Sequence, residues 1–384
     1  MGRRWDVAVV GGGAAATAAA IALARAGRSV VVLERSSYDR ARIGETLAPV
    51  ARLPLVQLGA WESFIKDAPV AWPGTRSAWG CAELDDTSFV RSAYGDGWHI
   101  DRSRFDAMLA GIAADAGACV RLRARVSECR AGPHGGWEID VATSRTPETL
   151  RAAVLIDAVG RASLPMRART RRRIAPDRLV GIVATFAAAP ARDHRTLVEA
   201  VAEGWWYSAA VPNAGLSVAY MTDADLKPAG RGRLGEWWRM QLERAPHTRS
   251  RLRRARQRTT LSVVAANTYS TTPMVGSDWL AIGDAAVAYD PLSSLGLCRA
   301  MESGLQAARA IAARTAGDPN AFDDYERGVR ASWNEYLRMR AMYYRQERRW
   351  PDSVFWWRRQ AAPSTLGIDL IGRGAHGHGR LDPP

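Results

Sequence analysis

The sequence predicts an α/β protein that begins with a Rossmann-type dinucleotide-binding unit. Trp5 to Val10 is a short apolar run of the kind that forms a buried parallel strand. A glycine-rich turn, a small-residue helix from Ala14 to Ala26 and a second apolar run from Ser29 to Leu33 follow in order. Further along, TFAAA, GLSVAYMT and TLSVVAANTYS have strand-like composition, and helix-forming sequence runs on from Asn320.

The turn after the first strand reads Gly11-x-Gly13-x-x-Ala16, and each small residue has a physical role. Gly11 permits the tight turn, Gly13 lets the backbone approach a pyrophosphate, and Ala16 keeps the helix close to the sheet. The free N–H groups at the helix start, around Ala14 and Ala15, are expected to face the phosphates.

Glu34 stands at the end of the second strand, where a carboxylate can accept hydrogen bonds from the two hydroxyls of an adenosine ribose. An acid at this position disfavours a 2′-phosphate and argues against NADP. The order strand, glycines, helix, acid makes the motif specific. Gly230-x-Gly232-x-x-Gly235 matches the same string without that context, and we expect a loop there.

The formal net charge of +14 invites a nucleic-acid interpretation, but the composition argues against it. Lys66 and Lys227 are the only lysines among 53 basic residues, which suggests a GC-rich coding bias. Two basic runs, Arg167–Arg173 and Arg249–Arg258, are either solvated faces or docking sites for an acidic partner. No nucleic-acid-binding motif accompanies them, so no nucleic acid is expected.

Cysteine and histidine spacing predicts neither a disulfide framework nor a metal site. The four cysteines are scattered, and Cys298 is expected to be a small buried hydrophobe. The amino terminus resembles a signal peptide, but Asp6 and three glycines interrupt the pattern. We therefore expect no export, no membrane span and a cytoplasmic location.

Downstream segments resemble flavin-dependent halogenases and their hydroxylating relatives. RIGETLAP, from Arg42 to Pro49, is similar to their GE[ST]xxP segment, and WHIDRSRFD, from Trp98 to Asp106, to a helix start whose arginine contacts FAD. LIDAVGRAS, from Leu155 to Ser163, is similar to the D-x-x-G-R-x-S stretch. WLAIGDAAVAYDPLSSLGL, from Trp279 to Leu297, is similar to the GD motif and the turn beside the flavin ring.

The resemblance implies FAD as cofactor. Asp284 would accept hydrogen bonds from the ribityl chain, and a helix from Leu297 to Ala312 would direct its N–H groups at the flavin. The expected cofactor-binding residues are Gly11, Gly13, Ala14, Ala15, Ala16, Glu34, Arg35, Arg42, Gly44, Arg102, Val126, Gly283, Asp284, Gly296 and Leu297.

The resemblance also implies a p-hydroxybenzoate hydroxylase-like architecture. An FAD-binding domain would comprise residues 1–68, 97–175 and 265–315, and an antiparallel-sheet substrate domain residues 69–96 and 176–264. A C-terminal helical region would follow over 316–371, with a flexible tail over 372–384. That tail carries His376 and His378.

Two positions speak against halogenation. The glutamate of the halogenase turn falls on Ser293, and the halogenase lysine falls near Arg76. Arginine cannot lose its proton to carry a halogen, and serine cannot replace a carboxylate base. GWWYS, from Gly204 to Ser208, and the segment from Glu347 to Arg359 are more similar to flavoproteins that install quinone cofactors on tryptophan side chains of other proteins.

The resemblance therefore implies an FAD-dependent monooxygenase that hydroxylates an indole or phenol-like ring, free or in a peptide, through a C4a-hydroperoxyflavin. Reduced flavin would come from NAD(P)H, through a separate reductase in preference to direct reduction, and O2 would be the co-substrate. A halogenase, an alkene reductase of the geranylgeranyl reductase type and a non-catalytic FAD-containing partner protein are the alternatives.

Side-chain roles beyond the cofactor stay open at this point. Ser293 and Ser294 either donate hydrogen bonds near the flavin or only shape the turn. Trp205, Trp206 and Tyr207 either line an aromatic-binding cavity or pack the substrate domain. Trp356 and Trp357 either form an exposed docking surface or pack a helix.

Overall fold

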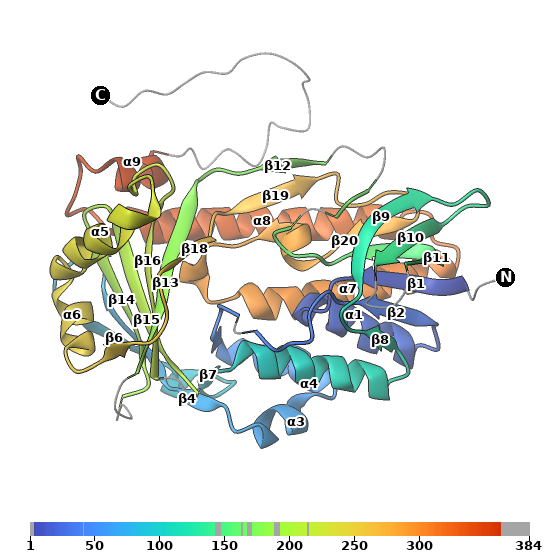
Figure 1. Cartoon of the computed structure of the whole chain (residues 1–384), viewed down its shortest axis with the longest axis horizontal. Helices are drawn as coiled ribbons and strands as arrows, with labels where there is room; N and C mark the ends of the chain where they lie inside the picture. The colour runs from blue at the N-terminus through green and yellow to red at the C-terminus, as the bar shows by residue number, and fades with distance from the viewer. Residues whose placement is uncertain are drawn as a thin grey trace, which may run out of the picture.

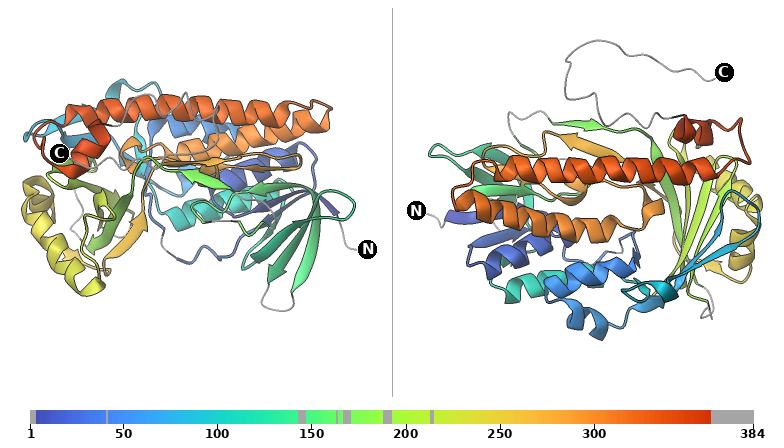
Figure 2. Two further views of the ribbon diagram at one scale, coloured as in Figure 1. Left: turned by 90° about the horizontal axis from the view of Figure 1, so that it is seen from above. Right: turned by 180° about the vertical axis from the view of Figure 1, so that it is seen from behind.

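The computed structural model describes residues 4–40, 42–142, 147–162, 164–166, 171–187, 193–212 and 215–361. Two sheets lie at opposite ends of the molecule, and the long helix α8 (Ala321–Gln346) runs beside both of them (Figures 1 and 2). The tail from residue 362, Ser163 and residues 167–170 lie outside the described residues, so the expectations for them stay untested.

The first sheet has seven strands around a parallel centre. β1 pairs in parallel with β2 and with β11, and β20 extends the parallel part beyond β11, whereas β9 and β10 form an antiparallel flap. The order is β8 (Cys119–Arg121), β2 (Val30–Leu33), β1 (Arg4–Val10), β11 (Glu148–Asp157), β10 (Trp137–Ala142) and β9 (Arg125–Ala131), with β20 (Trp279–Ala281) beside β11.

Helix α1 (Ala14–Arg25) connects β1 to β2, so the predicted βαβ unit is confirmed with ends that differ by about one residue. All four residues of β2 and nine residues of α1 are buried, because the parallel strands are covered on both faces. Helix α4 (Arg102–Asp115) and helix α7 (Gly296–Thr315) pack beside α1.

The second sheet has eight strands and is antiparallel except for the pairing of β14 with β5. Helices α5 (Arg231–Glu243) and α6 (Pro246–Leu252) cover one of its faces. The order is β17 (Arg256–Gln257), β13 (Leu179–Ala187), β16 (Gly215–Asp223), β15 (Gly204–Val211), β14 (Thr196–Val201), β5 (Gly74–Ala78) and β6 (Asp85–Ser88), with β18 (Ser262–Ala265) also on β13.

One local expectation is wrong. The expected loop at Gly232 and Gly235 is the first half of helix α5, because Leu234 and Trp238 bury an apolar stripe against the sheet and override the glycines. The run TLSVVAANTYS forms strands, as its composition predicts. It divides between β18 and β19 (Tyr269–Thr272), which joins a separate three-stranded sheet with β12 (Arg172–Ile174) and β21 (Val287–Ala288).

Short elements connect the two large sheets. The strands β3 (Thr46–Leu47), β7 (Gly97–His99) and β4 (Val70–Trp72) form a second three-stranded sheet. Helices α2 (Arg52–Gln57) and α3 (Trp61–Lys66) lie between β3 and β4 in sequence. In the part of the chain that the structure describes, 3-10 turns complete the connections at Pro49–Ala51, Phe89–Arg91, Gly283–Ala285 and Pro291–Ser293. Among the described residues, no helix combines the length and apolar character that a membrane crossing needs.

The carboxyl-terminal helices fasten the second sheet. Trp356 of α9 (Val354–Gln360) is buried and donates its indole N–H to the carbonyl of Val201 at 2.9 Å, whereas Trp357 is half-buried. The packing alternative therefore describes Trp356. The buried Arg359 donates to Asp223 at 2.6 Å and lies over the ring of Phe355.

Both basic runs are partly structural. Arg171 pairs with the buried Asp157, and Arg173 donates to the carbonyl of Ala162 at 2.8 Å. Arg251, from the second run, donates to the carbonyl of Arg195 at 2.9 Å, and burial lowers its pKa. The solvated-face interpretation therefore fails for Arg171 and Arg251, whereas Arg173 is exposed.

Candidate functional site

A cavity of about 1240 Å³ opens between the glycine turn, the first turn of α7 and one face of the second sheet. Ligand sites for one small molecule usually span roughly 300–1,000 Å³. The volume therefore leaves room for a dinucleotide and a second molecule. Its lining comes from segments far apart in sequence, among them residues 10–15, 42–46, 158–162 and 264–266.

The glycine turn forms one end of this cavity. Gly11 has φ of +111°, and a Cβ there would lie 2.2 Å from the carbonyl oxygen of Ala158. A Cβ on Gly13 would meet nothing within 4 Å, and Gly13 caps α1 without any side-chain hydrogen bond. The N–H groups of the first helical turn are therefore open to an anion, as the motif predicts.

The alanines of the motif divide between two roles. Ala14 and Ala15 line the cavity, whereas Ala16 is fully buried away from it. Ala16 thus fits the expected close approach of helix and sheet.

Glu34 lines the cavity at the end of β2 and is already held by the protein. Its Oε2 accepts the N–H of Gly12 at 2.7 Å. Its Oε1 accepts the N–H and the hydroxyl of Ser36 at 2.8 and 2.6 Å and a hydrogen bond from Arg42 at 3.2 Å. Each carboxylate oxygen has about two acceptor positions, so Oε1 is fully occupied and one position on Oε2 is left for a ribose hydroxyl.

Five arginines surround the same space: Arg35, Arg42, Arg102, Arg125 and Arg161. Arg102 donates to the carbonyl of Ile43 at 3.1 Å, but its Nε is buried without a hydrogen-bond partner in the described part of the chain. A buried donor of this kind fits an anionic or carbonyl group of a ligand. Gly44 and Val126, two of the expected cofactor-binding residues, also line the cavity.

Asp284 projects from the 3-10 turn Gly283–Ala285 that follows β20, and it lines the cavity. Burial raises the pKa of its carboxyl, and the nearby Arg161, with Nε 3.3 Å from Oδ2, opposes that rise. Arg161 was missing from our expected site, although the D-x-x-G-R-x-S segment contained it. Gly283 faces α7 instead, where its N–H donates to Ser303 Oγ at 3.0 Å.

The two serines of the turn before α7, Ser293 and Ser294, have different roles. Ser293 Oγ donates to the carbonyl of Asp290 at 3.0 Å, so it shapes the turn. Ser294 has left-handed φ of +50° and lines the cavity. Helix α7 then begins at Gly296 without a side-chain cap. Gly296 and Leu297, both expected to bind the cofactor, line the cavity.

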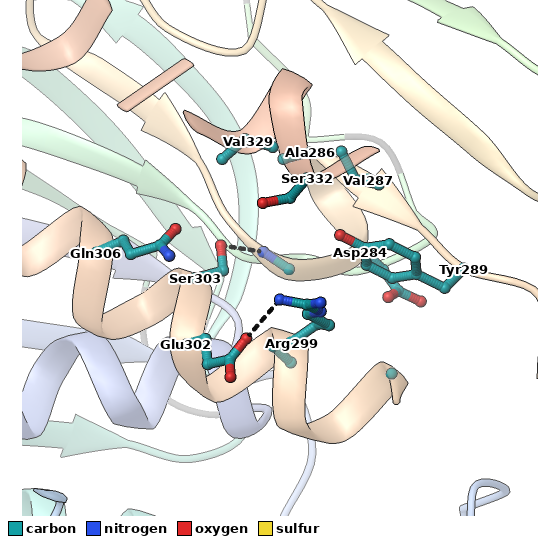
Figure 3. A pocket seen from close by; sticks show the side chains of 13 residues that line it. Asp284, Ala286, Val287, Tyr289, Arg299, Glu302, Ser303, Gln306, Val329 and Ser332 are labelled. Carbon is teal, nitrogen blue, oxygen red and sulfur yellow. Dashed lines mark hydrogen bonds and ion pairs between the residues drawn. The ribbon is translucent and has the colours of Figure 1, made fainter. Parts of the chain in front are cut away.

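A second, much smaller cavity of about 30 Å³ lies behind that turn (Figure 3). Asp284 and Tyr289 line both cavities, and Arg299, Glu302 and Ser303 of α7 close the small one. It has room for about two water molecules and is too small for a cofactor.

The far end of the large cavity is mostly apolar, with one polar corner. Val183, Ala219, Met221 and Val264 line it from the second sheet. The corner consists of Glu45, Thr46, Tyr207 and Ser217.

Glu45 is the titratable group of this corner. It is 7% exposed, and burial raises the pKa of its carboxyl. Gly44 donates its N–H to Glu45 Oε2 at 3.1 Å, and the hydroxyl of Tyr207 contacts that of Thr46. We did not single out Glu45 from the sequence, although it stands in the GE[ST] segment.

Trp205 and Trp206 do not line the cavity. Neighbouring strand residues point to opposite faces, and Trp206 packs against Trp238 beneath α5. Trp205 shares a face with Tyr207 but donates its N–H to the hydroxyl of Tyr344 at 3.2 Å, toward the C-terminal helices. The packing alternative is confirmed for both tryptophans, and of the three aromatics Tyr207 faces the cavity.

The described residues contain no group of three or more His, Cys, Asp or Glu side chains that could hold a metal ion. Cys298 is buried, and burial raises the pKa of its thiol to about 12.

Comparisons with known proteins identify the family. A sequence model described as tryptophan halogenase matches residues 77–370, and one described as FAD binding domain matches residues 6–44. The chain belongs to the tryptophan halogenase family. It is an FAD-dependent oxidoreductase, and the resemblance to flavin-dependent halogenases and their hydroxylating relatives is confirmed.

Three members or neighbours of this family show how far the similarity extends. LodB of Marinomonas mediterranea, provisionally named an FAD-dependent oxidoreductase, is 27% identical over 93% of this chain and 97% of its own length. The myxobacterial chondrochloren halogenase CndH has a TM-score of 0.84 at 24% identity and covers 94% of this chain and 86% of its own.

The peptidyl tryptophan dihydroxylase QhpG, essential for tryptophylquinone cofactor biogenesis, has a TM-score of 0.78 at 23% identity, covering 96% and 81% of the two chains. The two structural similarities establish a shared fold. The expected α/β fold class is confirmed.

Proposed function

We propose that this member of the tryptophan halogenase family is an FAD-dependent monooxygenase that hydroxylates an indole or phenol-like ring. The observation that carries the proposal is the absence of lysine from the cavity. Lys66 ends helix α3, Lys227 follows β16, and neither lines the cavity, whose described basic lining residues are all arginines. A guanidinium stays protonated and cannot carry a halogen as an amine does.

The two positions that correspond to halogenase residues support the same conclusion. Arg76 lies in β5, away from the cavity lining, and its Nε pairs with Asp86 Oδ1 at 2.9 Å. Ser293 is engaged in the turn and provides no carboxylate.

Hydroxylation asks less of the side chains. Reduced FAD and O2 supply the oxygen atom that enters the ring and the electrons that convert the second oxygen atom to water. The apolar wall at Val183, Ala219 and Met221 would hold the ring and exclude water. Glu45 would accept the proton that the ring carbon loses, since it is the carboxyl of the polar corner.

A separate reductase is the electron source we propose. The second glycine string lies in helix α5 and forms no nucleotide-binding turn. No second dinucleotide-binding motif is visible in the sequence, which supports delivery of reduced flavin from outside.

The test is a mass measurement. Purified protein loaded with FAD is supplied with a flavin reductase, NADH, oxygen, bromide and indole or a tryptophan-containing peptide. Products heavier by one oxygen atom support the proposal.

Other products overturn it. Brominated products would identify a halogenase, and anaerobic alkene reduction would identify a reductase of the geranylgeranyl reductase type. Peroxide release across a broad aromatic panel, with no modified product, would favour a non-catalytic FAD-containing partner protein.

A further inference from the structure

The strand β18 has one edge free of strand pairing within the described part of the chain. It pairs with β13 along its other edge, with Val180 opposite Ala265 and Ile182 opposite Val263. Ala266 donates its N–H to the carbonyl of Leu179 at 3.0 Å. This hydrogen bond establishes that Ala266 and Val264 direct their N–H and C=O groups toward β13. In an antiparallel pair every second residue directs its N–H and C=O away from the partner strand. Val263 and Ala265 therefore direct theirs outward.

This free edge borders the cavity. Val264, Ala265 and Ala266 line it. The side chains of Val264 and Met221 both lie over Gly181, since a Cβ there would lie 3.4 Å from Val264 Cγ2 and 3.1 Å from Met221 Sδ. Val264 thus belongs to the apolar wall of the site. A strand added beside β18 would lie about 4.7–4.9 Å away and would direct alternate side chains toward that wall.

The segment just before β18 carries uncompensated positive charge. Arg253, Arg254 and Arg256 are exposed, and no ion pair within the described ranges involves them. Arg249 of the same run is paired with Glu243 at 2.7 Å. The whole chain carries a net charge of +14, so this surface favours an acidic partner.

From these observations we infer that the substrate ring belongs to an extended, acidic polypeptide segment that adds a strand to the free edge of β18. Backbone hydrogen bonds to Val263 and Ala265 hold the segment in register, and the arginines before β18 attract it. One of its aromatic side chains then enters the apolar end of the cavity. The inference rests on the proposed hydroxylation and names the class of substrate.

The experiment uses a fluorescein-labelled nonapeptide, Val-Glu-Val-Glu-Trp-Glu-Val-Glu-Val, with blocked ends, and the FAD-loaded full chain. In an added strand its tryptophan and valines share one face and its glutamates the other. Val263→Pro removes an outward donor and places a ring on the edge without breaking the ladder to β13. We expect it to weaken binding, measured by fluorescence anisotropy, by about tenfold, because both strand pairing and access are lost. Val263→Ala keeps the N–H and should bind within about twofold of the wild type.

A second set of variants tests the role of charge. One triple variant replaces Arg253, Arg254 and Arg256 by Glu. The matched control replaces three other exposed arginines by Glu, namely Arg338, Arg345 and Arg348, which lie on or just beyond α8. We expect only the first triple variant to weaken binding and to abolish its dependence on salt. The same peptide with Lys in place of each Glu should bind the wild type at least about tenfold more weakly.

The outcomes separate the two proposals. If Val263→Pro binds the peptide like Val263→Ala, strand addition is wrong, whatever the enzyme does to free indole. If the wild type hydroxylates neither indole nor the peptide, the proposed function is wrong, while the anisotropy still decides whether the edge binds polypeptide. Unchanged turnover of free indole by Val263→Pro, whose residue does not line the cavity, shows that this variant folds, and loss of peptide turnover alone supports the inference.

Discussion

At the scale of single residues, Glu45 is a carboxyl whose surroundings favour its neutral form. Burial raises its pKa, so the carboxylate that can accept a proton forms only above the ordinary range of glutamate. If Glu45 takes the proton from the ring, the hydroxylation rate of the wild type rises with pH through this elevated pKa.

Glu45→Gln should therefore lower kcat by about 10²–10⁴-fold and remove the ascending limb of the pH profile. The measurement is kcat against pH at saturating substrate, with bound FAD determined from absorbance. Glu62→Gln, on the exposed side of α3, is the matched control. A retained ascending limb in Glu45→Gln would assign the proton to another group.

His99 is a second buried titratable residue, and it affects stability. Burial lowers the pKa of its imidazole from 6.5 to about 4. Its Nε2 lies 2.6 Å from the carbonyl oxygen of His194. Its Nδ1 is buried and has no hydrogen-bond partner among the described residues. A pKa that is lower in the folded state stabilises the protein above pH 6.5, and this stabilisation is lost as pH falls toward 4.

We expect about 3 kcal/mol to be lost through this group between those two pH values. His99→Gln, which keeps a donor but does not titrate, should flatten the dependence of the unfolding free energy on pH over that window. Urea unfolding at several pH values measures it, with His134→Gln, an exposed position, as control. An equally steep dependence in both variants would contradict the prediction.

At the scale of elements, the contact between α1 and α7 depends on a glycine that the sequence did not mark. A Cβ on Gly304 would lie 2.3 Å from the carbonyl oxygen of Ala15 and 2.8 Å from the nitrogen of Ala19. Backbone atoms cannot move aside as a flexible side chain can. The small residues of α1 therefore serve packing against α7 as well as the approach to the sheet.

Gly304→Ala should destabilise the protein by about 1–3 kcal/mol despite the better helix propensity of alanine. Gly328→Ala, in α8 with nothing within 4 Å of its Cβ, should be neutral or stabilising by up to about 1 kcal/mol. Thermal unfolding of the two variants distinguishes them. Equal stabilities would show that the two helices can separate without cost.

Helix α8 holds the turn before α7 through a buried arginine. Arg340 donates to Asp290 Oδ2 at 3.1 Å and to Asp177 Oδ2 at 2.8 Å, and Tyr344 donates to the same oxygen of Asp290 at 2.8 Å. Arg340 and Asp290 are 9% and 1% exposed. The cavity-lining end of the turn is therefore fixed from behind by the C-terminal helices.

Arg340→Leu should cost about 3–5 kcal/mol, because it leaves two buried carboxylates without their partner. Arg338→Leu, two residues away and exposed, should change stability by less than about 0.5 kcal/mol. Denaturant unfolding compares them. A mild effect of Arg340→Leu would mean that Asp177 and Asp290 become protonated or hydrated without strain.

At the scale of the whole molecule, one cavity joins segments that are remote in sequence. The glycine turn and Glu34 lie at one end of the chain, and Asp284, Gly296 and Leu297 lie far toward the other end, yet all line the same space. A ligand that contacts both groups of residues stabilises only the folded state.

Bound FAD should therefore raise the free energy of unfolding by about 2.7 kcal/mol when its concentration is a hundred times its dissociation constant. ADP, which can occupy only the end near Gly11 and Glu34, makes fewer contacts and should raise the unfolding temperature less than FAD at equal ligand concentration, because its dissociation constant is larger. Differential scanning fluorimetry of the flavin-free chain with FAD, ADP or no ligand measures both effects. No response to FAD would remove the basis of the assigned site.

The sequence by itself determined the βαβ unit, the fold class and most of the residues that line the end of the cavity around Gly11 and Glu34. These features arise from local patterns, since a tight turn, a close helix and a strand-end acid each need particular residues at fixed spacing. The C-terminal helices from Asn320 were equally visible, since α8 and α9 follow from a helical pattern of apolar residues.

Only the tertiary structure decided which side chains share the far end of the cavity. Trp206 and Tyr207 are neighbours in sequence, but the pleat sends one into the core beneath α5 and the other toward Glu45. Gly304, Arg340 and the free edge of β18 acquire their roles from segments distant in sequence. Such pairings depend on how the sheets and helices pack, which no local pattern of residues specifies.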